Sequence, residues 1–162
     1  MNIADIARKD IGKKEKPGNT GFQDKELEAR MKSVGWQVGW AWCAGIQEAW
    51  AWEAFPEKKE AIKGLFVPSA VNTFRNLTRA GYVSSMIPTV GAFVYWQRIQ
   101  DGNALWQGHA GVVSKVVSDT EFYSIEGNTN SAGSREGDSV QEKHRFVKKV
   151  DDGLQVIGFV IL

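Results

Sequence analysis

The chain has too few cysteines for a disulfide scaffold and no apolar run long enough for a membrane span. It has a single cysteine, Cys43, so it forms no internal disulfide and its stability has to come from packing. No apolar run approaches the length that crosses a bilayer, so we expect no membrane partner. The first ten residues, MNIADIARKD, are charged and lack the apolar stretch of a secretory signal, which predicts synthesis in the cytoplasm without a signal peptide.

The chain also lacks an excess of charge of either sign. Its formal net charge is +1, and basic residues mix with acidic ones instead of forming a stripe, so we expect no nucleic-acid partner. A hydrophobic content of 43% and a charged content of 24% are typical of a folded globular protein. A length of 162 residues predicts one domain, spanning 1–162, and we expect a monomer.

Hydrophobic periodicity divides the chain into a helical half and a strand-rich half. Helical spacing predicts four helices, over residues 2–12, 22–34, 42–54 and 69–81. After Pro88 the spacing changes to two, and short β-branched and aromatic runs alternate with turns. These runs are GAFVYWQ, HAGVVSKVV, EFYSIEGN, SVQEKHRFV and LQVIGFVIL. Helices followed by strands predict an α+β domain with a mainly antiparallel sheet.

The cysteine lies in WAWCAGIQEAW, where it is either packing or chemistry. Free cysteine usually behaves as a small buried hydrophobe. Here, however, Gly35 and Gly39 predict a preceding loop, which places Cys43 in the first turn of a helix. Unpaired backbone N–H groups and the helix macrodipole favour a thiolate at such a place, so Cys43 is a candidate nucleophile.

A nucleophilic thiol needs a base, and the chain has two histidines. His109 opens the strand HAGVVSKVV between small residues, which leaves room around its ring. A structural role, with the ring bonded to a backbone carbonyl, is the alternative for this residue. His144 lies between charges in EKHRF, which favours a solvated strand face.

The base in turn needs a carboxylate or amide that orients it, and SIEGNTN offers Glu126 and Asn128. A two-residue turn at 119–120 would set Gly111 opposite Asn128, and all three polar candidates would share one face. In this register Asn128 is diagonal to His109, roughly 7–8 Å away between backbones, and Glu126 is farther. A bulge would change this ranking, so spacing alone does not choose between them.

These motifs, in this order, resemble the CHAP family, the cysteine, histidine-dependent amidohydrolases/peptidases related to papain-like and NlpC-type cell-wall hydrolases. The resemblance extends from EKPGNTG to the last strand. It implies a papain-like fold, with N-terminal helices packed on a C-terminal antiparallel sheet, and cleavage of an amide in peptidoglycan. It also implies that Cys43 is the nucleophile, His109 the base, Glu126 the orienter and Asn128 a supporting residue, and so favours Glu126 where the simple register favours Asn128.

Weaker candidates surround this set. By likeness to the upstream glutamine of papain-like proteases, Gln37 is a candidate oxyanion donor, and Trp42 and Trp106 are candidate groove residues because they neighbour the nucleophile and the base. The aspartate-rich calcium loop of some relatives is absent, so we expect no metal and no cofactor. The charged turn GSREGD resembles segments of phage and prophage members and is either a surface turn or a substrate contact.

Several functions remain open from the sequence. The wall hydrolase could be an N-acetylmuramoyl-L-alanine amidase or an endopeptidase, delivered as an endolysin through a holin, by a phage tail or by a secretion system. In a toxin role it would have an immunity protein as partner. The alternatives are activity on a non-wall amide and a non-catalytic wall-binding or tail module on the same fold. A zinc site from Cys43, His109 and His144 is disfavoured because these positions supply no close ligand pair.

Overall fold

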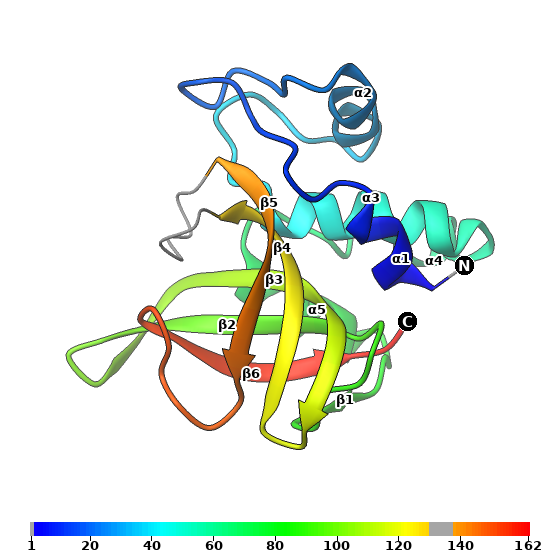
Figure 1. Cartoon of the computed structure of the whole chain (residues 1–162). Coiled ribbons are helices and arrows are strands. Elements are labelled where there is room, and N and C mark those ends of the chain that lie inside the picture. Colours follow the sequence, from blue (N-terminus) through cyan, green and yellow to red (C-terminus); the bar gives the residue numbers. More distant parts are fainter. Residues whose placement is uncertain (1, 130–137) are drawn as a thin grey trace.

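The computed structural model describes residues 2–129 and 138–162 and places the helices first in the chain, as predicted (Figure 1). Side chains cap three of the helices, because Asn2, Asp24 and Ser69 each accept a hydrogen bond from a first-turn backbone N–H. The second helix begins later than expected, because Phe22 forms an isolated β-bridge with Glu15. The elements are α1 (Ile3–Arg8), α2 (Lys25–Ser33), α3 (Cys43–Ala54), η1 (Pro56–Lys58), α4 (Lys59–Ile62) and α5 (Ala70–Arg79).

One sheet forms the second half, with strand order β1-β6-β2-β3-β4-β5 and antiparallel pairing between all named neighbours. Its strands are β1 (Ser84–Ser85), β2 (Phe93–Gln100), β3 (Asn103–Ser118), β4 (Glu121–Thr129), β5 (Ser139–Phe146) and β6 (Leu154–Val160). The α+β class and the antiparallel sheet are therefore confirmed. β3 starts six residues before His109, so this histidine lies inside a strand instead of opening one.

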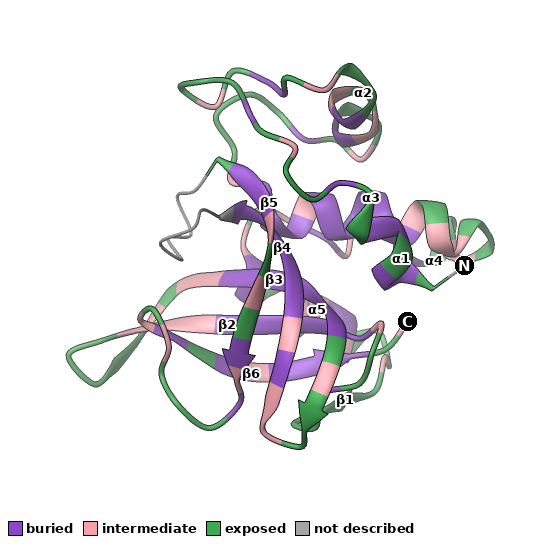
Figure 2. Ribbon diagram, viewed as in Figure 1, coloured by how far each residue is buried: buried purple, intermediate pink, exposed green. Residues whose placement is uncertain are grey.

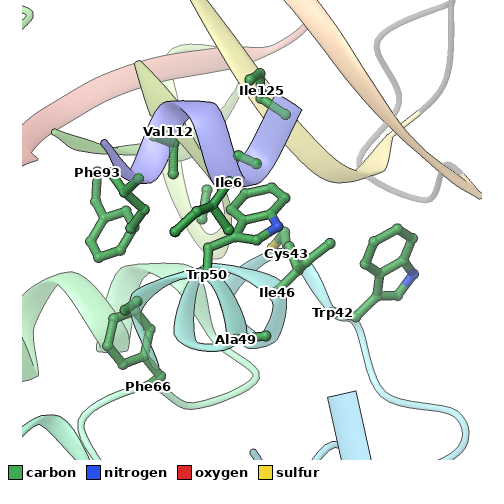
Figure 3. Packing of buried hydrophobic residues seen from close by; sticks show 14 of the residues in the cluster. Ile6, Trp42, Cys43, Ile46, Ala49, Trp50, Phe66, Phe93, Val112 and Ile125 are labelled. Atoms are coloured by element: carbon green, nitrogen blue, oxygen red, sulfur yellow. The ribbon is translucent and has the colours of Figure 1, made fainter. Parts of the chain in front are cut away.

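The two faces of the central strands belong to two hydrophobic clusters. Phe93 and Tyr95 of β2 belong to the cluster that includes α1 and α3, whereas Val94 and Trp96 belong to the second cluster. Figure 2 shows α3 and the middle of the sheet as mostly buried, and Figure 3 shows the apolar side chains gathered around α3. Helix α3 is therefore held on the sheet along most of its length.

Close packing at Gly127 fixes the start of α3 against β4. A Cβ atom at this position would lie 2.6 Å from the Trp42 ring and 2.7 Å from Ile46 Cγ2, closer than side chains approach one another. The glycine therefore lets the N-terminus of α3 reach the strand that carries Glu126. This contact brings the only cysteine of the sequence to the sheet.

Two further features bear on the predictions. In the described part of the chain, no helix combines the length and apolar character needed to cross a membrane. Arg135 and Glu136 of the GSREGD turn lie outside the described residues, and Asp138, which ends the turn, is exposed.

Candidate active site

Cys43 is the first residue of α3, as predicted, and lines a groove despite being only 4% exposed. The preceding residue, Trp42, provides no side-chain cap, and the first turn of the helix contains no acidic residue. The N–H groups of the first turn have no partner within the helix, and the positive end of the macrodipole attracts negative charge. The thiol is thus at a place suited to a nucleophile.

His109 is buried at 1% exposure and presents one ring nitrogen to a carboxylate. Its Nε2 lies 2.8 Å from Oε2 of Glu126, while its Nδ1 has no hydrogen-bond partner among the residues that the structure describes. Burial lowers the pKa of His109, but interactions with the Cys43 side chain and with Glu126 outweigh it and raise the pKa to about 9. The ring is therefore an imidazolium at neutral pH.

The influence of Cys43 on this pKa indicates that thiol and imidazole are close neighbours. A catalytic hydrogen bond between them does not need good geometry in the free enzyme, because such bonds tighten when substrate binds. Since Nε2 is engaged by Glu126, proton exchange with the sulfur falls to Nδ1. The chain thus brings together Cys43, His109 and Glu126, the side chains predicted as nucleophile, base and orienter.

Glu126 is completely buried and, besides contacting His109, accepts three hydrogen bonds from two residues. Arg145 donates from Nε to Oε1 over 2.8 Å and from Nη2 to Oε2 over 2.7 Å, and Ser124 Oγ donates to Oε1 over 2.6 Å. Burial raises the pKa of Glu126, but Arg145 and then His109 hold it well below its usual range. Its carboxylate therefore stays charged and acts as a fixed acceptor for the imidazolium.

Arg145 is itself anchored in this buried network. Its Nη1 donates to Oδ2 of Asp152 over 3.0 Å, and its guanidinium carbon lies 5.2 Å from the ring centroid of Trp96. The Trp96 ring lies 5.5 Å from the His109 ring, so it contacts both cations of the network. Burial lowers the pKa of Arg145. The carboxylates of Glu126, Asp152 and Asp151 outweigh this effect and raise the pKa above its usual value.

Two bulges change the register between the strand that carries His109 and the strand that carries the candidate orienters. The β3–β4 turn pairs Ser118 with Glu121, as predicted, but two register shifts farther along the ladder leave Val112 opposite Ile125. The two shifts together preserve the faces and move Glu126 and Asn128 alike two residues closer to His109 than the regular hairpin would. The simple register, which favours Asn128, was therefore wrong. The contact with the base identifies Glu126 as the orienting candidate, because its Oε2 lies 2.8 Å from Nε2 of His109.

Asn128 has a different place in the same site. It is buried, has a left-handed backbone conformation with φ of 56°, and lines the groove that contains Cys43. It therefore faces the space where a substrate would bind, which is consistent with a supporting role.

The groove runs between the start of α3, the segment before α5, α5 itself and β3. It has a volume of about 720 Å³, enough for several residues of a peptide. Arg75 and Arg79 are the charged residues on its wall, and among the described lining residues none is acidic. It is lined by Ala41, Cys43, Val67, Pro68, Ser69, Ala70, Asn72, Arg75, Asn76, Arg79, Trp106, Gln107, Gly108 and Asn128.

The weaker candidates have different outcomes. Trp106 lines the groove and is 71% exposed, so it is available to a ligand. Trp42 is fully buried, with its ring edge-on to Phe22 at 5.0 Å, so the expectation that it lines the groove was wrong and its role is packing. Gln37 is exposed in the loop before α3 and is not among the groove-lining residues.

His144 belongs to a separate surface pair. Its Nε2 lies 2.7 Å from Oε1 of Glu121, and its ring stacks on Tyr123 at 4.7 Å. Within residues 2–129 and 138–162, no group of three His, Cys, Asp or Glu side chains could hold a metal ion.

The sequence reasoning missed Ser124, Arg145 and Asp152, which complete the buried network. Arg145 directly follows His144 in EKHRF, and neighbouring residues of a strand point to opposite faces. The solvated face predicted for His144 therefore implied that Arg145 points inward, where it could be a buried partner of Glu126.

Comparisons of the chain with protein-family models, curated proteins and solved structures find no match.

Proposed function

We propose that this protein is a cysteine amidohydrolase of the CHAP type, with a papain-like fold, that cleaves an amide bond of peptidoglycan. One observation carries the proposal: His109 is fixed 2.8 Å from a buried Glu126 and is coupled to Cys43 at the start of α3, beside an open groove. A carboxylate, an imidazole and a thiol in this order form the relay that activates a cysteine nucleophile.

The reaction begins with Cys43 as the thiolate and with its proton held on Nδ1 of the His109 imidazolium. The sulfur attacks the carbonyl carbon of the scissile amide, a carbon–sulfur bond forms, and the carbonyl electron pair moves to oxygen. As the tetrahedral intermediate collapses, the carbon–nitrogen bond breaks and His109 gives its proton to the leaving amine. The acyl group remains on Cys43 as a thioester.

Hydrolysis of the thioester uses the same residues. His109 takes a proton from water, the hydroxide oxygen attacks the thioester carbon, and the carbon–sulfur bond breaks to release the acid. The Cys43 backbone N–H is one candidate donor to the oxyanion in both steps. Glu126 holds the ring and stabilises its charge throughout, since its own partners keep it ionised.

The groove supports a peptide as substrate. Its volume suits an extended chain, and Arg75 and Arg79 provide positive charge for the free carboxylates that wall peptides carry. Exposed Trp106 offers an aromatic face to an apolar side chain or a sugar ring. We further propose that a holin, a phage tail or a secretion system delivers the protein to the wall. If the protein acts as a toxin, an immunity protein inhibits it.

The test is turnover of purified peptidoglycan from several wall types, with mass spectrometry of the released fragments. We expect the native protein to release fragments whose new termini identify an amidase or an endopeptidase, and Cys43→Ala to release none. His144→Ala is the matched control, because it removes a histidine outside the site and should retain activity. Equal release by the native protein and Cys43→Ala, or no release from any wall, would overturn the proposal.

A further inference from the structure

A second pocket adjoins the groove and contains an acidic residue that the proposed mechanism does not use. Glu48 of α3 is only 4% exposed and lines this pocket. The two hollows share Ala41, Val67 and Pro68 as lining residues, so the pocket opens beside the site of Cys43. The two hollows are therefore neighbours on the molecule.

The surroundings of the Glu48 carboxyl group are unusual for a buried acid. Among the residues that the structure describes, none gives it a hydrogen bond or an ion pair, and no other charged side chain lines the pocket. The indole of Trp36 donates instead to the carbonyl of Trp40 over 3.1 Å. Burial alone raises the pKa of Glu48 to about 7, so near neutral pH the carboxyl is poised to ionise when a cation arrives.

The walls of the pocket are suited to a cation. Trp36, Trp40 and Phe66 line the pocket together with Glu48, and an ammonium group over the face of such a ring is attracted by its π-electrons. The volume of the pocket is about 30 Å³, which admits a single small polar group but excludes a whole side chain. A primary ammonium at the end of a chain meets both conditions.

We propose that Glu48 and its aromatic walls form a substrate subsite that binds a primary ammonium group, so that the enzyme prefers peptides with a free amine near the scissile bond. This role as a substrate subsite rests on the function proposed above. Glu48 follows Cys43 by five residues, which corresponds to roughly 7.5 Å along the helix axis and about 140° around it, so the two side chains are farther apart than the axial rise. The amine is therefore expected on a long side chain, or at a chain end, at least about two residues from the bond that is cut.

The first test examines the pocket without any wall substrate. Carbon-13 NMR of the labelled glutamate carboxyls gives the pKa of Glu48, with its signal assigned by its absence from Glu48→Gln. Ethylammonium chloride should lower this pKa by about 1 at ten times the dissociation constant, whereas the same concentration of sodium chloride should leave it unchanged. An equal pKa in both salts would overturn the proposal.

The second test uses Cys43→Ala protein, which retains bound peptide, and a wall tetrapeptide containing lysine. Calorimetry compares the free peptide with versions acetylated on the α-amine, on the ε-amine or on both. Acetylation of the recognised amine should weaken binding at least tenfold, and Glu48→Gln should remove this difference while Glu60→Gln, an exposed glutamate, keeps it. Equal affinity for all four peptides would overturn the subsite.

The two proposals fail in distinguishable ways. If ethylammonium lowers the pKa of Glu48 but no wall type is cleaved, ammonium binding at Glu48 is supported and peptidoglycan is the wrong substrate. If walls are cleaved through Cys43 but neither ethylammonium nor acetylation has an effect, the hydrolase stands and the subsite is overturned.

Discussion

Glu126 and Glu48 are both buried glutamates beside one groove, yet their surroundings are opposite. Glu126 receives hydrogen bonds from Arg145 and Ser124 and contacts His109, whereas Glu48 has no partner in the described part of the chain. The pKa of Glu126 is consequently lowered, and that of Glu48 is raised to about 7. Burial alone therefore does not determine the charge of a carboxyl group; the partners brought by the neighbouring strands do.

The contrast also separates two uses of a carboxylate. Glu126 is permanently charged and rigidly held, which suits a group that must orient a histidine through every step. Glu48 changes its charge near neutral pH and has unused acceptors, which suits a group that meets a ligand. The difference arises because β5 supplies Arg145 to one site, while the pocket around Glu48 is lined by apolar and aromatic residues.

The largest expected effect is on stability, from Arg145→Met. This change leaves the Glu126 carboxylate buried without its main partner, which should lower the free energy of unfolding by about 3–5 kcal/mol. Denaturant titration measures the loss, and Arg79→Met, which removes an exposed arginine, should change stability by less than about 0.5 kcal/mol. The double variant Arg145→Met, Glu126→Gln should be more stable than Arg145→Met alone; if it is not, Arg145 does not act through Glu126.

The next effect is on catalysis, from Glu126→Gln. Without the carboxylate the imidazolium loses its partner, so kcat/KM should fall by roughly 10²–10⁴-fold. The pKa of His109 should also fall from about 9 towards its usual value, which moves the alkaline limb of the pH–rate profile to lower pH. Glu121→Gln is the matched control, because Glu121 contacts His144 on the surface; an equal loss in both variants would contradict the assignment.

A third prediction follows from the raised pKa of Glu48. The folded protein binds the carboxyl proton of Glu48 more tightly than the unfolded chain does. The contribution of this protonated carboxyl group to stability is therefore fully present below the usual glutamate pKa and is lost as pH rises to about 7. Native protein and Glu48→Gln should therefore be equally stable near pH 4, and the variant should be more stable by roughly 3 kcal/mol at pH 8. Denaturant titrations at both values measure the difference, and a difference independent of pH would contradict it.

The two glutamates also show how far the sequence could lead. Cys43, His109 and Glu126 could be proposed from WAWCAGIQEAW, QGHAGVV and IEGN, because helix starts and strand alternation follow from local spacing. The choice of Glu126 over Asn128 could not be made from spacing, because it depends on which side chain reaches His109 after two bulges have changed the register. The Glu48 pocket could not be predicted either, because its walls come from separate segments that meet only in the folded chain.

Gly111 is the one local feature that does bear on the position of Glu126. A Cβ atom at this position would lie 2.8 Å from Cγ of Glu126 and 2.9 Å from the carbonyl oxygen of Ile125. Gly111→Ala should therefore push Glu126 away from His109 and destabilise the fold by about 1–3 kcal/mol. The backbone oxygen cannot yield as a flexible side chain can, so some displacement of β4 is unavoidable.

The same substitution at Gly45 is the control for this prediction. There a Cβ atom would meet only the flexible end of Met31 at 3.1 Å, and alanine favours the helix, so Gly45→Ala should be close to neutral. Denaturant titration and the pH–rate profile together distinguish the two sites. If Gly111→Ala loses stability but keeps the alkaline limb of the native pH–rate profile, the glycine serves packing alone. A shift of that limb to lower pH shows instead that the absence of a side chain at Gly111 allows the buried Glu126 carboxylate to reach His109.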